Sequence, residues 1–231
     1  MSAIKLMIDP GHGGRDPGAV ANGLVEKDLV LTIAHHVRNI MVRDYGVHVR
    51  MTRNSDVFVS LEERARIANE WGADYFLSIH CNAGGGTGFE TFRHPSAKSQ
   101  TSAFQDAIHH GVTRRLSVAN RGMKTANFAV LRMTNMPAVL TENLFVDHPG
   151  DARQLKDSDV LYELALGHVE GLVKLLNLKP VEVKVEKAPP SSMYRLRVDG
   201  QQVGAFSERY NLLEQLITYL GNAEKIELEK V

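Results

Sequence analysis

The segment Ile4-Lys5-Leu6-Met7-Ile8-Asp9-Pro10-Gly11-His12-Gly13-Gly14 decides how this chain begins to fold. Its apolar side chains run as far as Ile8 and stop at an Asp-Pro-Gly sequence, a combination that ends a strand and starts a loop. We therefore expect a short strand followed by a glycine-rich loop that carries His12. In an open α/β sheet, such a loop lies at the edge where ligands bind.

Downstream of this strand, the sequence alternates between helical and strand patterns. Apolar residues recur every three or four positions after Lys27, and Ser60 with Glu63 forms a capping box at the start of another helix. The expected helices cover residues 27–42, 60–71, 99–116 and 157–176, and the expected strands cover residues 47–51, 75–80, 89–93, 128–131 and 138–141. This alternation indicates an α/β fold with a mixed, mostly parallel central sheet flanked by helices.

The composition limits the classes of function. The 231 residues include 27 basic and 27 acidic side chains, and a formal net charge of zero argues against a nucleic-acid-binding protein. A single cysteine excludes an internal disulfide. No apolar run approaches the length of a membrane span, and the first residues lack the pattern of a signal peptide. We therefore expect no membrane insertion, and synthesis in the cytoplasm.

The composition changes after residue 178, where we place the end of the main domain, residues 1–178. Residues 179–193 alternate Val with Glu and Lys and end in a Pro- and Ser-rich run, as linkers do. Residues 194–231 show a strand, helix, strand pattern, which predicts a small C-terminal β-α-β module with Ser207 as the helix N-cap. The apolar positions of that helix are Leu212, Leu213, Leu216, Ile217 and Leu220. A unit of this size needs a partner surface to bury its core.

Three candidate metal ligands fall next to the expected strands and helices. His12 follows the first strand, Glu26 opens the first helix, and His80 closes the strand at residues 75–80. Two imidazoles and one carboxylate form a known catalytic zinc set, in which the fourth position is left for water. Cys81 follows His80 directly, so its side chain points to the opposite face of the strand and we expect it in the core.

Two further polar residues have alternative interpretations. Glu142 ends an apolar strand, where a carboxylate either carries protons for a metal hydrolase or forms a structural ion pair. Asn82 lies two residues past His80 and either binds the substrate or shapes a turn. We expect Arg53 and Arg64 to have structural roles, Arg53 in a turn and Arg64 paired with an acid.

Five motifs carry a resemblance to a known family, and they occur in order between about residues 4 and 177. They are DPGHGGRDPGA at 9–19, EKDL at 26–29, TR at 52–53 followed by LEER at 61–64, SIHCNA at 78–83, and MPAVLTE at 136–142. Together they resemble the zinc-dependent N-acetylmuramoyl-L-alanine amidases of the Amidase_3 type. One departure follows the last motif. Residues 143–148 read Asn-Leu-Phe-Val-Asp-His, where family members often have a small residue, Phe, Ser or Thr, and Asn.

The resemblance implies a substrate, a cofactor and residue roles. The substrate would be bacterial peptidoglycan, cut at the amide bond between N-acetylmuramic acid and L-alanine. Zinc would be bound by His12, Glu26 and His80. Glu142 would be the catalytic carboxylate, which takes a proton from the attacking water and passes it to the alanine amine.

The C-terminal unit carries a second, shorter resemblance. Residues 194–200 and 204–207 resemble the small C-terminal modules of amidase endolysins from Bacillus-type phages and, less closely, half of a SPOR module. This resemblance implies cell-wall binding, self-association, or both. Met193 precedes the unit, and an internal start there would yield the module alone.

These features favour a phage endolysin that is stored in the cytoplasm and acts on the cell wall after a holin releases it. A sporulation amidase acting after mother-cell breakdown is the close alternative, and the neighbouring genes would separate the two. A non-catalytic peptidoglycan-binding module is an alternative of another class, marked by loss of a ligand or of Glu142. A third alternative is a zinc peptidase that cuts a different bond of the cell wall, and analysis of the reaction products would distinguish it from an amidase.

Overall fold

The structure, a computed structural model, describes residues 4–181, 194–206 and 225–230. The chain divides into two compact units, residues 1–181 and 182–231. Among the described residues, no helix has the length and apolar character needed to cross a membrane.

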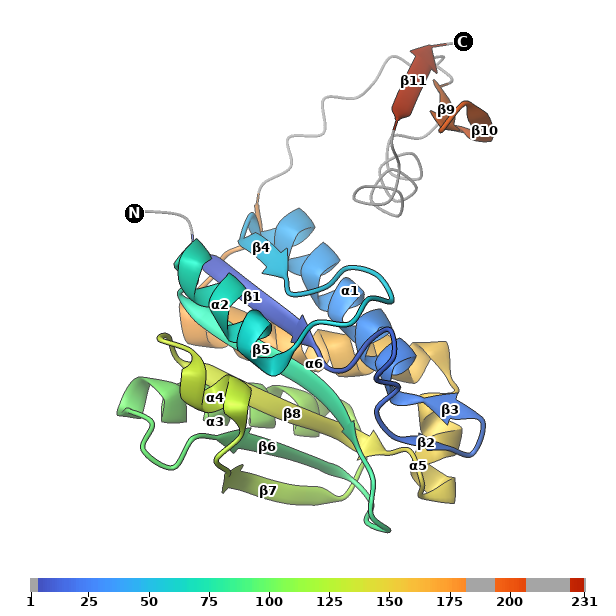
Figure 1. Ribbon diagram of the computed structural model, residues 1–231. Coiled ribbons are helices and arrows are strands. Elements are labelled where there is room, and N and C mark those ends of the chain that lie inside the picture. The colour runs from blue at the N-terminus through green and yellow to red at the C-terminus, as the bar shows by residue number, and fades with distance from the viewer. Residues whose placement is uncertain (1–3, 182–193, 207–224, 231) are drawn as a thin grey trace. The chain divides into compact units, whose positions relative to one another are not determined.

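A six-stranded sheet forms the centre of the first unit, and its strand order is β4-β1-β5-β8-β6-β7 (Figure 1). The strands are β1 (Lys5–Pro10), β4 (His48–Met51), β5 (Tyr75–Asn82), β6 (Phe89–Arg93), β7 (Asn120–Thr125) and β8 (Ala138–Phe145). All neighbours pair in parallel except β6 and β8, which are antiparallel. The expected mixed, mostly parallel sheet is confirmed.

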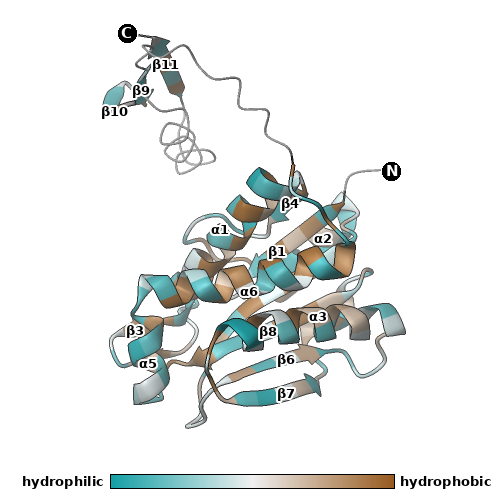
Figure 2. Cartoon of the chain, turned by 180° about the vertical axis from the view of Figure 1, so that it is seen from behind, coloured by the Kyte–Doolittle hydropathy of each residue, from teal (hydrophilic) through white to brown (hydrophobic). Residues whose placement is uncertain are grey.

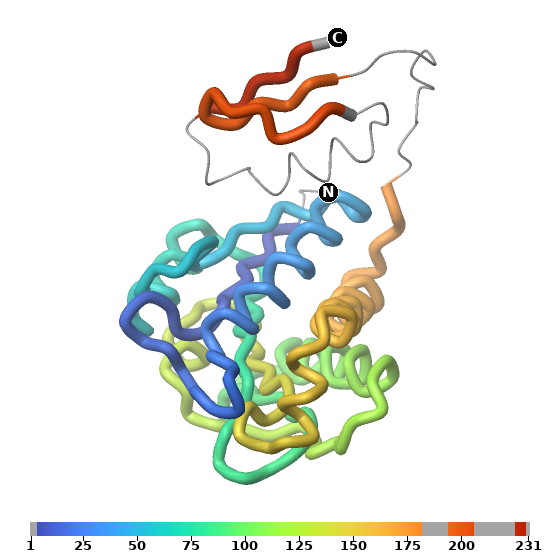
Figure 3. The backbone as a smooth tube through the Cα atoms, turned by 90° about the vertical axis from the view of Figure 1, so that its right-hand side faces the viewer, coloured from blue at the N-terminus to red at the C-terminus, as the bar shows by residue number. Residues whose placement is uncertain are grey.

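Helices cover both faces of this sheet. They are α1 (Glu26–Tyr45), α2 (Leu61–Trp71), α3 (Ser99–Arg115), α4 (Ala129–Met133), α5 (Pro149–Leu155) and α6 (Ser158–Leu176). Helices α1, α3 and α6 enclose the larger core on one face, which Figure 2 shows in front, and α2 and α4 enclose a smaller core on the other. Figure 3 shows these layers from the side, with α6 (orange) and α3 (green) across the sheet from α2 (teal). A short hairpin, β2 (Val20–Ala21) with β3 (Leu24–Val25), precedes α1.

One predicted strand was wrong, and one strand of the central sheet was missed. Residues 128–131, expected as a strand, belong mostly to helix α4, in which the adjacent residues Val130 and Leu131 are both buried. A four-residue apolar run has no periodicity long enough to separate a strand from a helix. The missed strand is β7, an edge strand whose sequence is polar and mostly exposed, so no apolar alternation marks it.

The second unit contains a three-stranded antiparallel sheet in the order β10-β9-β11. Its strands are β9 (Tyr194–Val198), β10 (Gln201–Phe206) and β11 (Ile226–Lys230). The single strand expected to open this unit is therefore a hairpin, and Asp199 and Gly200 make its turn with φ angles of 49° and 82°. An Asp-Gly pair with both φ angles positive is typical of a two-residue hairpin turn. The expected helix beginning at Ser207 and most of the expected linker lie outside the described residues.

Helices α3 and α6 approach each other through three glycines, Gly111, Gly167 and Gly171. A Cβ atom on Gly111 would lie 2.2 Å from the carbonyl oxygen of Gly167, and one on Gly171 would lie 2.6 Å from the carbonyl oxygen of Ala107. Both neighbours are backbone atoms, which cannot move aside as a flexible side chain can.

We predict that Gly171→Ala destabilises the protein, although alanine is the better helix former by about 1 kcal/mol. Overpacking against backbone should lower the free energy of unfolding by roughly 2 kcal/mol or more, measured by urea denaturation. Lys174→Ala, on the exposed face of the same helix, is the control and should change the value little. An increase in stability for Gly171→Ala would contradict this close approach.

A buried chain of hydrogen bonds links α6 to β8. His168 Nδ1 donates to the carbonyl of Leu164 (2.7 Å), so its Nε2 accepts from the Thr141 hydroxyl (3.0 Å). Asn143 Nδ2 donates to that same hydroxyl oxygen (2.9 Å). Burial lowers the pKa of His168 to about 4 from the usual 6.5, so the imidazole stays neutral in the folded protein.

This pKa makes stability depend on pH in a defined direction. Between pH 6.5 and pH 4 the unfolded state takes up a proton on His168 and the folded state does not, so stability falls as the pH falls. The contribution reaches about 3 kcal/mol at the lower end. We predict that His168→Gln flattens the decline in urea unfolding free energy between these pH values. Equal slopes for the two proteins would contradict a neutral buried histidine.

Candidate functional site

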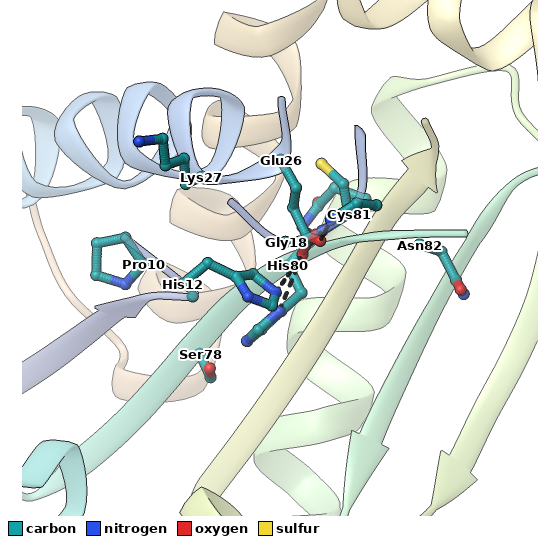
Figure 4. A network of polar contacts seen from close by, with 12 residues as sticks. Pro10, His12, Gly18, Glu26, Lys27, Ser78, His80, Cys81 and Asn82 are labelled. Carbon is teal, nitrogen blue, oxygen red and sulfur yellow. Dashed lines mark hydrogen bonds and ion pairs between the residues drawn. The ribbon is translucent and has the colours of Figure 1, made fainter. Parts of the chain in front are cut away.

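The three residues proposed as metal ligands converge at the carboxyl ends of β1 and β5 (Figure 4). One ligand atom from each of His12, Glu26 and His80 lies within 4.8 Å of the others. His12 Nε2 is 3.2 Å from Glu26 Oε1, and His80 Nδ1 is 3.0 Å from the same oxygen. Within the parts of the chain that the structure describes, this is the one cluster of His, Cys, Asp and Glu side chains close enough to share a metal ion.

Two glycines make room for these side chains. A Cβ on Gly11 would lie 2.2 Å from the His80 ring, and a Cβ on Gly18 would lie 2.6 Å from Glu26 Oε2. Gly18 also has a φ angle of 67°, which favours glycine. Gly11 and Gly18 of the first motif are therefore required by the close approach of the candidate ligands themselves.

Further contacts orient the three side chains. His12 Nδ1 lies 2.9 Å from Asp16 Oδ2, and because a carboxylate only accepts, the proton is on Nδ1 and Nε2 is the free ligand atom. Glu26 accepts backbone N–H groups from Ala19 (2.8 Å) and Cys81 (3.0 Å). The sequence analysis assigned no role to Asp16. Its position, four residues after the candidate ligand His12, was the feature that could have predicted this contact.

Two arginines hold the loop that carries His12. Arg64 donates to the carboxylate of Asp9 (2.8 Å) and to the carbonyls of Pro10 (2.7 Å) and His12 (2.6 Å). Arg53 donates to the carbonyls of Pro10 (3.0 Å) and Gly11 (2.7 Å). Burial alone would raise the pKa of Asp9, but the charge of Arg64 together with the hydrogen bonds from Arg64, Thr52 and Ser78 outweighs burial and lowers that pKa. The expected pairing of Arg64 with an acid is confirmed.

The electrostatics of the cluster keep its carboxylate ionised. Burial would raise the pKa of Glu26, but the neighbouring His12 and His80 side chains hold it well below its usual range. Burial would lower the pKa of His12, and the contact with Glu26 raises it instead. A negative oxygen beside two imidazole nitrogens suits a divalent cation, and this donor set is that of catalytic zinc sites.

Glu142 is next to this cluster on strand β8. It is in register with His80 on β5 and with Glu90 on β6, so the three side chains share one face of the sheet. Its Oε2 atom is buried and has no hydrogen-bond partner among the described residues. Burial raises the pKa of Glu142 to about 7 from 4.5, and the charge of Glu26 adds to this effect while His80 opposes it. A carboxyl with such a pKa can both accept and donate a proton near neutral pH.

Asn82 and Cys81 lie outside the metal-ligand set. The Asn82 amide donates to Glu90 Oε1 (2.7 Å) and accepts from the N–H of Ala83 (2.9 Å), and Figure 4 shows the side chain directed away from the three ligands. Contact between Asn82 and substrate stays a prediction. Cys81 is buried in the larger core, as expected, and burial raises its thiol pKa well above the usual value.

Comparison with known proteins gives the family. The model of the Amidase_3 family, described as N-acetylmuramoyl-L-alanine amidase, matches residues 6–174. The chain is 48% identical to a sporulation-specific N-acetylmuramoyl-L-alanine amidase of Bacillus subtilis, over 90% of this chain and 77% of that protein. It is 49% identical to the endolysin of Bacillus phage SPP1, over 75% of this chain and 66% of that protein.

Solved structures agree with this result. A crystal structure of N-acetylmuramoyl-L-alanine amidase from Clostridium difficile superimposes with a TM-score of 0.74 and 33% identity, covering 77% of this chain and 98% of that one. The catalytic domain of the amidase CwlV from Bacillus (Paenibacillus) polymyxa gives 0.72 and 32% identity, over 76% and 99% of the two chains. The chain therefore belongs to the Amidase_3 family, the N-acetylmuramoyl-L-alanine amidases that hydrolyse bacterial peptidoglycan.

Proposed function

We propose that this chain cleaves the amide bond between N-acetylmuramic acid and L-alanine with a zinc ion bound by His12, Glu26 and His80, and with Glu142 as the proton carrier. The observation that carries the proposal is the position of Glu142. Its buried, unpartnered carboxylate oxygen belongs to the residue that is in register with the ligand His80. A buried carboxylate without a partner is costly unless it has a task.

The chain's own residues account for the proton transfers. Bound zinc would supply a Lewis acid that polarises the scissile carbonyl and lowers the pKa of water. Glu142 Oε2 accepts the proton of the attacking water and then donates it to the nitrogen of the departing L-alanine. A pKa near 7 allows both transfers without a second residue.

Glu142→Gln should keep the fold and the zinc but lose the proton carrier. We expect release of free L-alanine N-termini from purified peptidoglycan to fall by at least about 100-fold, a typical contribution of general acid–base catalysis. Zinc content, measured by mass spectrometry, should stay at one ion per chain. Glu62→Gln replaces an exposed carboxylate on α2 and serves as the control. Wild-type rates in Glu142→Gln would remove this residue from the mechanism.

Asp16→Asn should weaken zinc binding, because Asp16 holds the His12 ring with Nε2 facing Glu26. Outer-sphere partners of this kind typically contribute about 10- to 100-fold to metal affinity. A chelator-competition titration measures the zinc Kd directly, and activity of the variant should rise as zinc is added. An unchanged Kd would show that Asp16 does not orient a ligand.

The cellular role that we propose is that of a phage endolysin, with residues 194–231 as a wall-binding or self-association module joined by a linker at 179–193. The phage SPP1 endolysin, 49% identical, supports this role. The sporulation-specific amidase, 48% identical, supports the alternative. A holin gene beside the coding sequence would favour the endolysin, and sporulation genes there would favour the alternative. Light scattering of the full chain, against a chain ending at residue 181, tests self-association.

A further inference from the structure

A second group of charged side chains lies beside Glu142, on the side away from the metal-ligand cluster. It consists of Glu90 on β6 and of Arg121 and Lys124 on β7. Glu90 Oε2 accepts from Arg121 Nε (2.8 Å) and from the Lys124 ammonium, and its Oε1 accepts from Asn82. The Glu90 side chain is 6% exposed, whereas those of Arg121 and Lys124 are 34% and 39% exposed. Two accessible cations thus share one buried anion.

The guanidinium of Arg121 is held in a defined orientation. Its Nε is bound to Glu90, and its Cζ lies 4.8 Å from the centre of the Phe145 ring. A Cβ on Gly86 would lie 2.5 Å from that ring and 3.2 Å from Arg121 Nη1, so the missing side chain of Gly86 leaves space for the stack. Neither Nη atom has an acceptor among the described residues. An arginine fixed in this way can offer its free nitrogens to a carboxylate.

The sheet order places these cations on the side of Glu142 that is away from the metal ligands. Glu142 lies between His80 on one neighbouring strand and Glu90 on the other. The residue that protonates the departing amine must be next to the alanine nitrogen. A stem peptide that leaves Glu142 on the side away from the metal ligands would run toward β6 and β7, with the muramic acid toward the metal ligands.

The distances suit a carboxylate one residue beyond the alanine. Adjacent strands are about 4.8 Å apart, so β7 is roughly 10 Å from β8, and the Arg121 and Lys124 side chains reach back to Glu90 on β6. An extended peptide spans about 3.5 Å per residue, so two residues cover roughly 7 Å. In peptidoglycan the residue after L-alanine is a glutamyl unit whose α-carboxyl group is either a free carboxylate or an amide.

We propose that Arg121 and Lys124, oriented by Glu90, bind the α-carboxylate of the second stem residue and make the enzyme prefer the carboxylate form over the amidated form. The inference rests on the proposed function, because it uses Glu142 to fix the direction of the peptide. Binding a group that does not react lowers KM and leaves kcat nearly unchanged.

The test uses two muramyl peptides that differ only in a carboxylate or a carboxamide on the second stem residue. For the wild-type full chain we expect kcat/KM to be at least about tenfold higher for the carboxylate substrate. The difference should come from a lower KM, with kcat nearly the same for both substrates. Removing only the cations would leave the buried Glu90 carboxylate without a compensating charge, so the main variant is Glu90→Gln with Arg121→Gln and Lys124→Gln. This variant should lose about tenfold on the carboxylate substrate alone, and the preference should fall to about one.

Two further variants separate recognition from structure. Arg121→Lys keeps the charge but loses the paired N–H donors of the guanidinium. Its preference for the carboxylate substrate over the carboxamide should therefore lie between those of the wild type and the neutral variant. Arg114→Gln removes an exposed cation at the end of α3 and should keep the full preference.

The outcomes distinguish the two proposals. Equal wild-type cleavage of both substrates, or an equal loss on both in the neutral variant, would overturn the carboxylate subsite and leave the amidase mechanism in place. Failure of the wild type to release an L-alanine N-terminus from either substrate would overturn the proposed function, and the subsite with it.

Discussion

The bonds of Arg64 to Asp9 and to the carbonyls of Pro10 and His12 are the interaction on which the site depends. The loop after β1 must leave the sheet and turn His12 toward Glu26, and its carbonyls then have no strand partner. Buried backbone oxygens without donors would destabilise the fold. The guanidinium supplies those donors, and Asp9, which also accepts from Thr52 and Ser78, keeps its charge compensated. Removing one partner of such a buried pair typically costs roughly 3–5 kcal/mol.

Much of the site could be predicted from the sequence because its chemical residues lie at element boundaries. His12 follows an apolar strand, His80 is near the end of another, and Glu26 begins a helix, so parallel pairing brings them to one edge. What could not be predicted depends on contacts between distant segments. Gly11 is required because the His80 ring occupies the space that a side chain at position 11 would need. The residues around Gly11 in the sequence do not show that His80 lies there.

The errors in the predicted secondary structure also come from contacts between distant segments. A short apolar run at residues 128–131 fits either a helix or a strand, and only packing against the second core selects helix α4. Strand β7 is polar because it forms an exposed edge, and its pairing with β6 is fixed by the tertiary fold. The Asp199-Gly200 turn is different, because an Asp-Gly pair between two strand patterns is itself a local hairpin signal. The sequence therefore contains a local signal for the β9-β10 hairpin.

Three glutamates in this site have different protonation behaviour because their neighbours differ. Glu26 contacts two imidazoles and two backbone N–H groups, and Glu90 contacts two side-chain cations, so the pKa of each is lowered. Glu142 lies between the strands of His80 and Glu90, is buried, and receives no hydrogen bond at Oε2, so its pKa rises to about 7. The cations that compensate Glu90 are bound to Glu90 itself and give Glu142 no hydrogen bond. Of the three carboxyl groups, Glu142 is therefore the one whose pKa lies near neutral pH, while Glu26 and Glu90 remain ionised.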